Sequence, residues 1–236
     1  MTLNEINNEF DILYNNISSA GAPNLNEYEK SLFLTKAQDE LVRMYYTGKN
    51  SNYNSFESDE ETRRYLDSLI KTKQVSLSSP QQYFGFKQYN VKKDNSMLFI
   101  VRETAENASE GCLNGVVMPI VPVTHEDINR IMNDPFKRPN ERKVLRYDEG
   151  ENGVYFNLLS KYNLKSYTIT YLKKPRPIIL EDLTPEFFTI DGEWKHSEPE
   201  IPDLLQHKVI SRAVELAKAT YIGDLNTTFA VDARTL

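Results

Sequence analysis

The stretch Leu25–Tyr46, LNEYEKSLFLTKAQDELVRMYY, decides the fold. Its Asn26 precedes Glu29 by three residues, the spacing of a capping box, in which each side chain accepts a hydrogen bond from the other residue's backbone amide. Apolar side chains then recur at helical spacing and form one stripe: Leu34, Ala37, Leu41, Met44 and Tyr45. The opposite face is charged: Lys30, Lys36, Asp39, Glu40 and Arg43. The sequence therefore predicts a long capped helix that packs on its apolar stripe and turns its charged face to water or to a polar neighbour.

The composition is typical of a folded globular protein. Hydrophobic residues make up 39% and charged residues 26% of the 236 positions, enough for one large core or two small ones. No apolar run approaches the roughly 20 residues that span a bilayer, and the first ten residues lack the features of a secretory signal, so we expect no membrane partner. The net charge of −6 weakly disfavours bulk nucleic-acid binding. Cys112 is the single cysteine, which excludes an intrachain disulfide and favours a reducing compartment.

Helical patterns lie at both ends of the chain and strand patterns lie between them. Residues 3–17 and 203–221 show apolar steps of three and four, and a third helix is predicted from Ser58, with Glu61 as its capping partner, to Ile70. Short runs rich in Val, Ile, Tyr, Phe and Thr follow between residues 74 and 173, separated by turn signals. One short helix interrupts them after the capping pair Thr124 and Asp127.

These patterns predict an α+β fold in which the terminal helices form a helical bundle and a β-rich insertion separates them. The expected segments are an N-terminal helical part (1–73), a β-rich insertion with one short helix (74–200), and a C-terminal helix that joins the bundle before an extended tail (201–236). The proline-punctuated connection 180–200 is expected to contain a hairpin at Asp191-Gly192.

No pattern of catalytic or ligand-binding residues stands out. His125, His196 and His207 are far apart and none has a partner at metal-ligand spacing. Cys112 has no neighbouring cysteine or paired histidine, and the chain contains no phosphate-binding loop, dinucleotide fingerprint or nucleophile elbow. We therefore expect a protein that is not an enzyme and that holds no cofactor and no metal.

The strongest local charge lies in residues 137–146, KRPNERKVLR. A loop of this kind can meet phosphate or an acidic protein surface, or it can simply be a solvated loop that enters a strand. Aromatic residues that would stack on bases are missing within the run, which weakens the nucleic-acid interpretation. Arg138, Arg142 and Lys143 are the candidate contact residues here.

Two blocks of the sequence resemble a known family. Residues 9–46, EFDILYNNISSAGAPNLNEYEKSLFLTKAQDELVRMYY, and residues 200–226, EIPDLLQHKVISRAVELAKATYIGDLN, resemble the ends of virion structural proteins from crAss-like tailed phages. Those proteins are similar to the head-to-tail connector, or adaptor, ring proteins of short-tailed phages. The resemblance extends over residues 4–47 and 167–228, about half of the chain.

The resemblance implies a structural virion protein at the head–tail junction or in the tail, assembled in the host cytoplasm. Such adaptors form rings, commonly of twelve copies, that join the portal protein to the next tail ring protein and continue a channel through which DNA passes as cargo. Their extended C-terminal segments often dock on the portal, which makes Thr227–Leu236 a candidate arm, with Phe229 and Val231 as its contact residues. The alternatives are another ring or collar position in the tail, or a nucleic-acid-binding module that uses residues 137–146.

Overall fold

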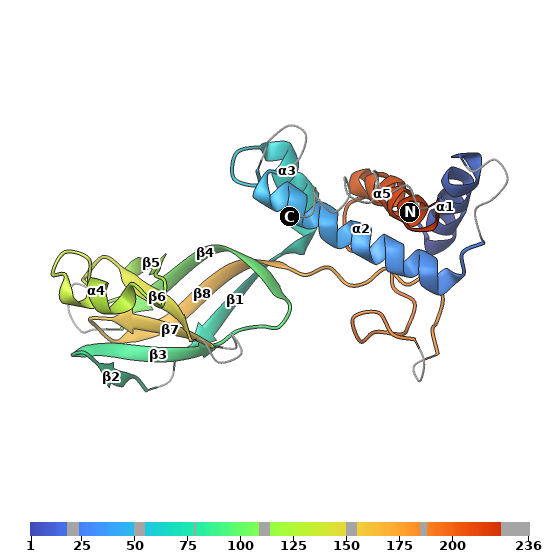
Figure 1. Cartoon of the computed structure of the whole chain (residues 1–236). Helices are drawn as coiled ribbons and strands as arrows, with labels where there is room; N and C mark the ends of the chain where they lie inside the picture. Colours follow the sequence, from blue (N-terminus) through green and yellow to red (C-terminus); the bar gives the residue numbers. More distant parts are fainter. Residues whose placement is uncertain are drawn as a thin grey trace. The chain divides into compact units, whose positions relative to one another are not determined.

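The computed structural model describes residues 1–17, 24–49, 55–77, 79–108, 114–149, 155–184 and 188–222. Of residues 16, 17, 149, 221 and 222 only the backbone is described. The chain divides into two compact units (Figure 1). One comprises Met1–Leu69 with Lys174–Leu236 and is called the helical unit here; the other, Ile70–Lys173, is called the β unit.

The helical unit contains the elements α1 (Leu3–Ile17), α2 (Glu27–Thr47), α3 (Glu60–Leu66), a 3-10 turn (Asp67–Leu69) and α5 (Asp203–Ile222). The predicted capping box at the start of α2 is confirmed. The Glu29 amide donates to Asn26 Oδ1 at 2.8 Å, and the Asn26 amide donates to Glu29 Oε2 at 2.9 Å. Gly48 ends α2 at φ +74°, where a Cβ atom would lie 3.0 Å from that of Ser55, so glycine is the residue that fits.

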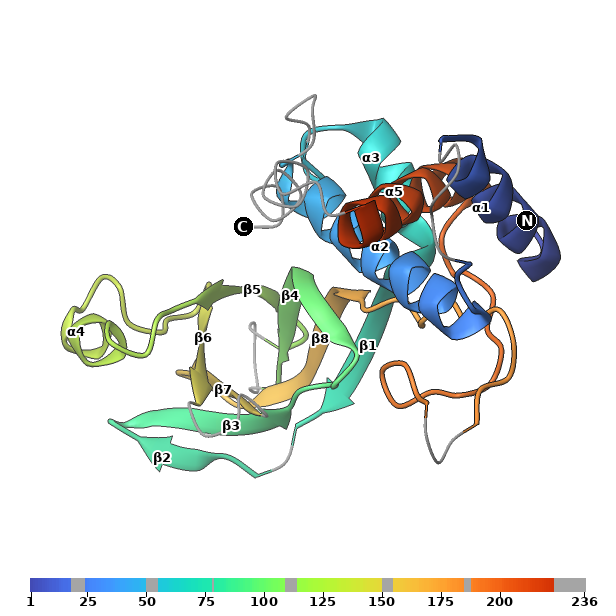
Figure 2. The same ribbon diagram turned by 45° about the vertical axis from the view of Figure 1, so that its right-hand side comes forward.

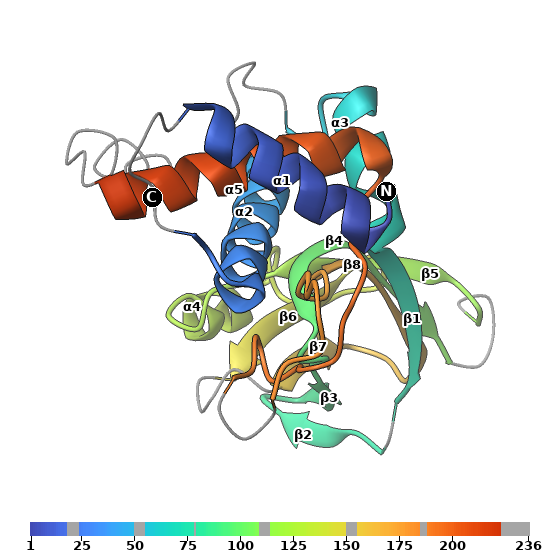
Figure 3. The same ribbon diagram turned by 90° about the vertical axis from the view of Figure 1, so that its right-hand side faces the viewer.

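Helix α2 is covered on more sides than its apolar stripe predicts. Leu34, Ala37 and Leu41 are buried as expected, but so are polar residues outside the stripe, among them Ser31, Thr35 and Gln38. The expected charged face is divided: Lys36 and Arg43 are exposed, whereas Lys30 and Glu40 form ion pairs with α1 and α5. The reason is that α5 and the connection after residue 174 pack along this helix, while Lys30 reaches Asp11 of α1 (Figure 3).

The third predicted helix was placed slightly wrongly. Asp59 is its N-cap, because the Asp59 carboxylate accepts hydrogen bonds from the amides of Glu61 and Thr62, whereas Ser58 bonds back to Ser55. The helix also ends earlier than expected. Ile70 already begins the first strand of the β unit.

The β unit is an eight-stranded sheet in the order β1-β8-β4-β5-β6-β7-β3-β2. Its strands are β1 (Ile70–Ser76), β2 (Gln81–Tyr83), β3 (Phe86–Lys92), β4 (Met97–Asn107), β5 (Val117–Pro122), β6 (Val144–Glu149), β7 (Tyr155–Ser160) and β8 (Leu164–Lys173). All neighbours are antiparallel except β5 and β6, which run parallel. The first half of β5 pairs with β4 and its second half pairs with β6. This change of partner lets the sheet curl over its own core (Figure 2).

Two apolar cores hold the β unit. The inner core lies within the curl and includes Tyr167, Leu158 and Val144. Tyr167 donates to Glu103, which also pairs with Arg146 at 2.9 Å, so a buried polar group bridges β8, β4 and β6. Burial raises the pKa of Tyr167, which keeps its hydroxyl protonated as a donor. The second core lies on the other face, where helix α4 (Ile128–Asn133) packs Ile128 and Met132 against β6 and β7.

The structure confirms a mixed fold with several helices and an eight-stranded curled sheet. That the terminal helices form a bundle stays a prediction, as does the division into segments 1–73, 74–200 and 201–236. The hairpin expected at Asp191-Gly192 is present: both residues have positive φ, and Ile190 pairs with Glu193.

Candidate interaction site

The predicted basic loop is an ordered pair of turns between α4 and β6. Asp134 organises the first turn, because its side chain accepts the Phe136 amide at 2.9 Å and its carbonyl accepts the amides of Lys137 and Arg138. Asn140 organises the second turn by accepting the Arg142 amide at 2.9 Å. The loop backbone is therefore held from within, and its side chains are left to face outward.

The candidate contact residues of this loop differ in their surroundings. Arg138 and Arg142 are exposed, and in the described part of the chain neither guanidinium has a hydrogen-bond or ion-pair partner. Lys143 is half-buried and donates from Nζ to the carbonyl of Phe136 at 3.2 Å. Arg146 points inward instead, where it pairs with Glu103 and its cation lies 4.7 Å from the centre of the Phe156 ring. Arg138 and Arg142 thus carry positive charge that is not held in a hydrogen bond or close ion pair, although Arg142 helps to lower the pKa of the neighbouring Glu141.

The other candidate residues, Phe229 and Val231 in the segment Thr227–Leu236, lie outside the described residues, as does Cys112. Their roles stay predictions. The three histidines lie in separate places: His196 contacts Asp182, His207 contacts Glu9, and the His125 ring lies beside Tyr147. Among the residues that the structure describes, no group of three or more His, Cys, Asp or Glu side chains could hold a metal ion.

The sequence reading missed two exposed aromatic residues beside the basic loop. Phe136 is 88% exposed and directly precedes Lys137, and Phe84 is 65% exposed in the turn between β2 and β3. Phe84 follows Tyr83, which packs against the core under α4, whereas Phe136 lies beyond the end of α4 and outside that core. Figures 1 and 2 show that α4 and the β2–β3 turn lie at the same end of the β unit. The signal in the sequence is Phe136 itself, which directly precedes the basic run 137–146.

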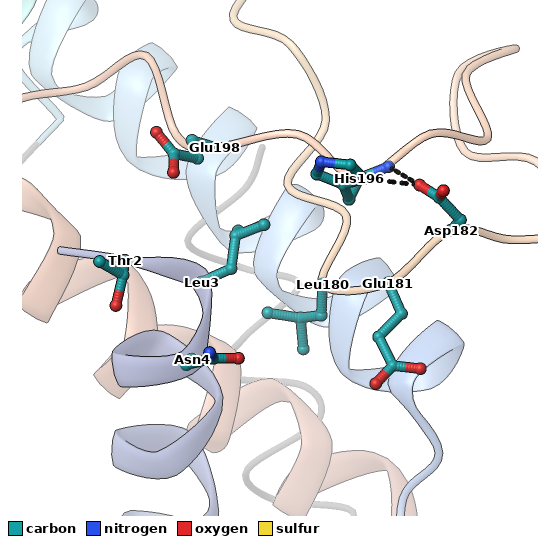
Figure 4. A pocket seen from close by; sticks show the side chains of 8 residues that line it. All are labelled: Thr2, Leu3, Asn4, Leu180, Glu181, Asp182, His196 and Glu198. Atoms are coloured by element: carbon teal, nitrogen blue, oxygen red, sulfur yellow. Dashed lines mark hydrogen bonds and ion pairs between the residues drawn. The ribbon is translucent and has the colours of Figure 1, made fainter.

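The helical unit contains an open acidic pocket of about 590 Å³ (Figure 4). It is lined by Thr2, Leu3, Asn4, Leu180, Glu181, Asp182, His196 and Glu198. Leu180 is buried and Leu3 half-buried, so the pocket has an apolar floor. Asp182 accepts a hydrogen bond from the His196 backbone amide at 2.7 Å and contacts the His196 ring. The hydrogen bond from the backbone amide holds the pKa of the Asp182 carboxyl below its usual range. Glu181 and Glu198 have no hydrogen-bond or ion-pair partner within the described ranges.

The two units carry opposite charge. Of the chain's 28 Lys and Arg residues 15 lie in the β unit, together with 11 of its 34 Asp and Glu residues. The β unit therefore has a formal charge of +4 and the helical unit one of −10, which the total of −6 conceals. Such an asymmetry favours contacts between unlike surfaces of different molecules.

Comparison with known proteins identifies the family. A family profile described as phage tail ring protein 3/4 matches residues 1–228. The chain belongs to this family. It is 36% identical over 245 aligned positions to Ring protein 4/5 of Bacteroides phage crAss001, an alignment that includes 99% of each chain. It is also 36% identical over 228 positions to Ring protein 3 of the same phage, covering 92% of this chain and 95% of that protein.

Family membership confirms the resemblance predicted from the terminal helices. The family consists of tail ring proteins of phages, which are structural components of the virion. In the described ranges, no helix is both long and apolar enough to cross a membrane. The basic loop and the acidic pocket are thus candidate contact sites of a tail ring protein.

Proposed function

We propose that this chain is a structural subunit of an oligomeric ring that serves as a head-to-tail connector, joining the portal to the tail and continuing the DNA channel. The observation that carries the proposal is the similarity to two crAss001 ring proteins over nearly the whole chain. A ring of identical subunits needs two different complementary surfaces on each subunit, because its contacts are head-to-tail. The two units of opposite charge supply surfaces of that kind.

The proposal includes a helical bundle of α1, α2 and α5 as the rigid part of the subunit. Helix α5 is joined to α2 by Arg212, which donates from Nη2 to Glu40 Oε1 at 2.6 Å and from Nε to Glu40 Oε2 at 3.1 Å. It is joined to α1 by Lys218, which donates from Nζ to the Leu13 carbonyl at 2.9 Å. These links connect the two chain ends, which are far apart in sequence.

Imaging tests the ring. The full chain is mixed with the portal protein of the same phage, and the subunits of the resulting particle are counted by electron microscopy. We expect a closed ring, of twelve copies, seated on the portal. A ring bound to another tail component and absent from the portal would support the alternative, a ring or collar farther along the tail. A chain that stays monomeric with all tail components present would contradict the proposed function.

The C-terminal segment Thr227–Leu236 is proposed as the arm that docks on the portal, with Phe229 and Val231 as contacts. Deleting the segment should weaken capture by the portal in a pull-down and leave the urea unfolding midpoint unchanged. The double variant Phe229→Ser with Val231→Ser should weaken capture in the same direction. Equal capture of the truncated and full chains would remove the arm from the proposal.

A nucleic-acid-binding module is the second candidate, because Arg138 and Arg142 are free and the β unit is positive. If these side chains contact phosphate, DNA affinity should fall steeply with salt. Replacing either arginine by Ala should then reduce the slope of log affinity against log salt by about 1. DNA binding that is weak and does not depend on these residues would exclude this second candidate and leave the ring as the proposed function.

A further inference from the structure

The aromatic side chain of Phe136 is exposed to solvent. Its neighbours on α4, Ile128 and Met132, are buried, but the chain turns at Asp134 and carries Phe136 away from the core. Both backbone groups of Phe136 are tied: the amide donates to Asp134, and the carbonyl accepts Lys143 Nζ. The side chain is therefore presented from a fixed backbone. A large exposed apolar side chain gains free energy when a partner removes it from water.

Phe84 adds a second aromatic residue at the same end of the β unit. It has φ +50°, a left-handed conformation that is unfavourable for a bulky side chain. The two-residue hairpin Phe84-Gly85 is a place where Asn-Gly is the usual choice. A strained and exposed aromatic residue is poorly explained by folding alone, which points to a role in contact with another molecule.

The charges around these rings specify the partner's chemistry. Lys137 is near Asp134 at 3.8 Å, but Arg138 and Arg142 have no such partner in the described part of the chain. A surface of two aromatic rings and two free guanidinium groups fits an apolar hollow with carboxylates at its rim. Duplex DNA fits less well, because Asp134 and Glu141 lie in the same loop and would face phosphate.

The pocket of the helical unit has the complementary chemistry. Leu3 and Leu180 are its two apolar lining residues, and Glu181 and Glu198 add carboxylates that have no hydrogen bond or close ion pair within the described residues (Figure 4). Glu198 also interacts electrostatically with the Met1 ammonium group. Asp182 is already engaged by His196, so it adds negative charge without being free. The volume of about 590 Å³ accommodates a benzyl group together with part of a guanidinium group.

We propose that Phe136 and Arg138 of one copy insert into the pocket at Leu180 and Glu198 of the next copy, and that this contact joins neighbouring subunits of the ring. The proposal rests on the proposed ring function. The occupant is a second copy of this chain, because the same sequence carries both complementary surfaces, on units of charge +4 and −10. A contact between two unlike surfaces is the kind that closes a ring.

Cysteine cross-linking tests the contact directly. In a Cys112→Ser background, Phe136→Cys and Asn4→Cys are combined in one chain, rings are assembled on the portal, and a short thiol cross-linker is added. We expect a ladder of covalent multimers on a denaturing gel. The matched control replaces Asn4→Cys by Ile12→Cys, an exposed residue of α1 outside the pocket, and should give no ladder.

Mixing separates contacts between copies from contacts within one copy. A mixture of the two single-cysteine chains should give a covalent dimer, whereas either chain alone should give none. Rings that form normally but yield no ladder and no mixed dimer would overturn the proposed contact and leave the ring function standing. If the microscope shows no rings with all tail components present, both the proposed contact and the ring function are contradicted.

A charge exchange provides a second, independent measurement. Arg138→Glu and Glu198→Arg should each reduce assembly affinity by more than about tenfold, and the two changes in one chain should restore most of it. Lys71→Glu, the same charge change on exposed β1, serves as the control and should have little effect. If both single variants assemble normally, the proposed contact is wrong, and loss of DNA binding by Arg138→Glu would then assign the loop to nucleic acid.

Discussion

The pair Arg212 and Glu40 is the most deeply buried ion pair among the described residues of the helical unit. Their side chains are 10% and 9% exposed, and the guanidinium group donates to both carboxylate oxygens. Arg212→Met keeps most of the apolar volume but leaves the Glu40 carboxylate buried without its partner. We expect the free energy of unfolding to fall by about 3 kcal/mol or more. Urea denaturation followed by circular dichroism measures the change.

The matched control for this substitution is Arg64→Met in α3. Arg64 pairs with Glu60 at 2.8 Å, but their side chains are 78% and 75% exposed. Exposed pairs contribute little because water and salt screen them, so the expected change is within about 0.5 kcal/mol. An equal decrease in the free energy of unfolding for the two variants would show that burial does not make the Arg212–Glu40 pair more important for stability than an exposed pair.

Asp39 gives the helical unit a pH dependence of known sign. Burial raises its pKa above the usual value, and Lys174, 3.6 Å away, opposes that shift only partly. A carboxyl group with a raised pKa binds its proton more tightly in the folded state, so its destabilising effect is present at neutral pH and is relieved as the pH falls through that raised pKa. Asp39→Asn should therefore stabilise the chain at pH 7, with the difference from wild type shrinking at acidic pH. Unfolding midpoints at a series of pH values test this.

Lys30 and Glu40 show where sequence reasoning stops for single residues. A helical period identifies which positions share a face, and it correctly placed Leu34, Ala37 and Leu41 inside. It does not give the number of neighbours that cover the helix. Because α5 packs on α2 and Asp11 of α1 lies within reach of Lys30, two charged residues predicted for the polar face form ion pairs.

The extended connection 176–180 is held in place by one row of polar side chains on α2. Gln38, Thr35 and Ser31 bond in turn to Arg176, Ile178 and Leu180, so an irregular segment lies along a helix without leaving its amides unpaired. Ser31→Ala removes the acceptor of the buried Leu180 amide. We expect a loss of about 1–3 kcal/mol and faster hydrogen exchange at Leu180. Ser211→Ala is the control, because the Ser211 hydroxyl is exposed and bonds within its own helix.

The β2–β3 hairpin offers an element whose stability and proposed function conflict. Phe84→Asn places a residue that tolerates φ +50° into the turn. The gain in stability is partly offset by loss of the aromatic contact with Tyr83, whose side-chain ring centre lies 4.8 Å from that of Phe84. We expect the β unit to become more stable by about 0.5 kcal/mol, measured by thermal unfolding, while ring assembly weakens. Lower stability would show that Phe84 is kept for folding instead.

Sequence patterns predicted the helices and the β-rich middle but not how the strands connect. The Phe84-Gly85 turn was missed because phenylalanine is not a turn-forming residue, so β2 and β3 were read as one run. The parallel pair β5 and β6 depends on contacts between strands separated by helix α4, which local patterns do not record. No local pattern marks the row of Ser31, Thr35 and Gln38 on α2, because its partner lies about 140 residues away in the chain.

For the whole molecule, the sequence reveals the family but not the division of charge between the two units. Family membership was recognisable because the helices at both ends carry it, and those were the best-predicted elements. The charge division was not recognised, because the sequence was summarised by one net charge of −6. The values of +4 and −10 become meaningful once the structure separates the β unit from the helical unit. The proposed contact between copies uses one surface from each unit, so it could be proposed only from the structure.

The charge division makes salt a probe of ring assembly. If the basic end of one copy meets the acidic pocket of the next, raising sodium chloride from about 0.1 M to about 1 M shortens the screening length from about 10 Å to about 3 Å and should weaken assembly. The neutral double variant Arg138→Gln with Glu198→Gln is the control, because it keeps the aromatic contact and removes the paired charges. Its affinity should be lower at low salt and should vary less with salt. Sedimentation velocity at several salt concentrations gives both curves. Parallel curves for the two chains would mean that Arg138 and Glu198 do not face each other in the ring, whatever other contact holds the copies together.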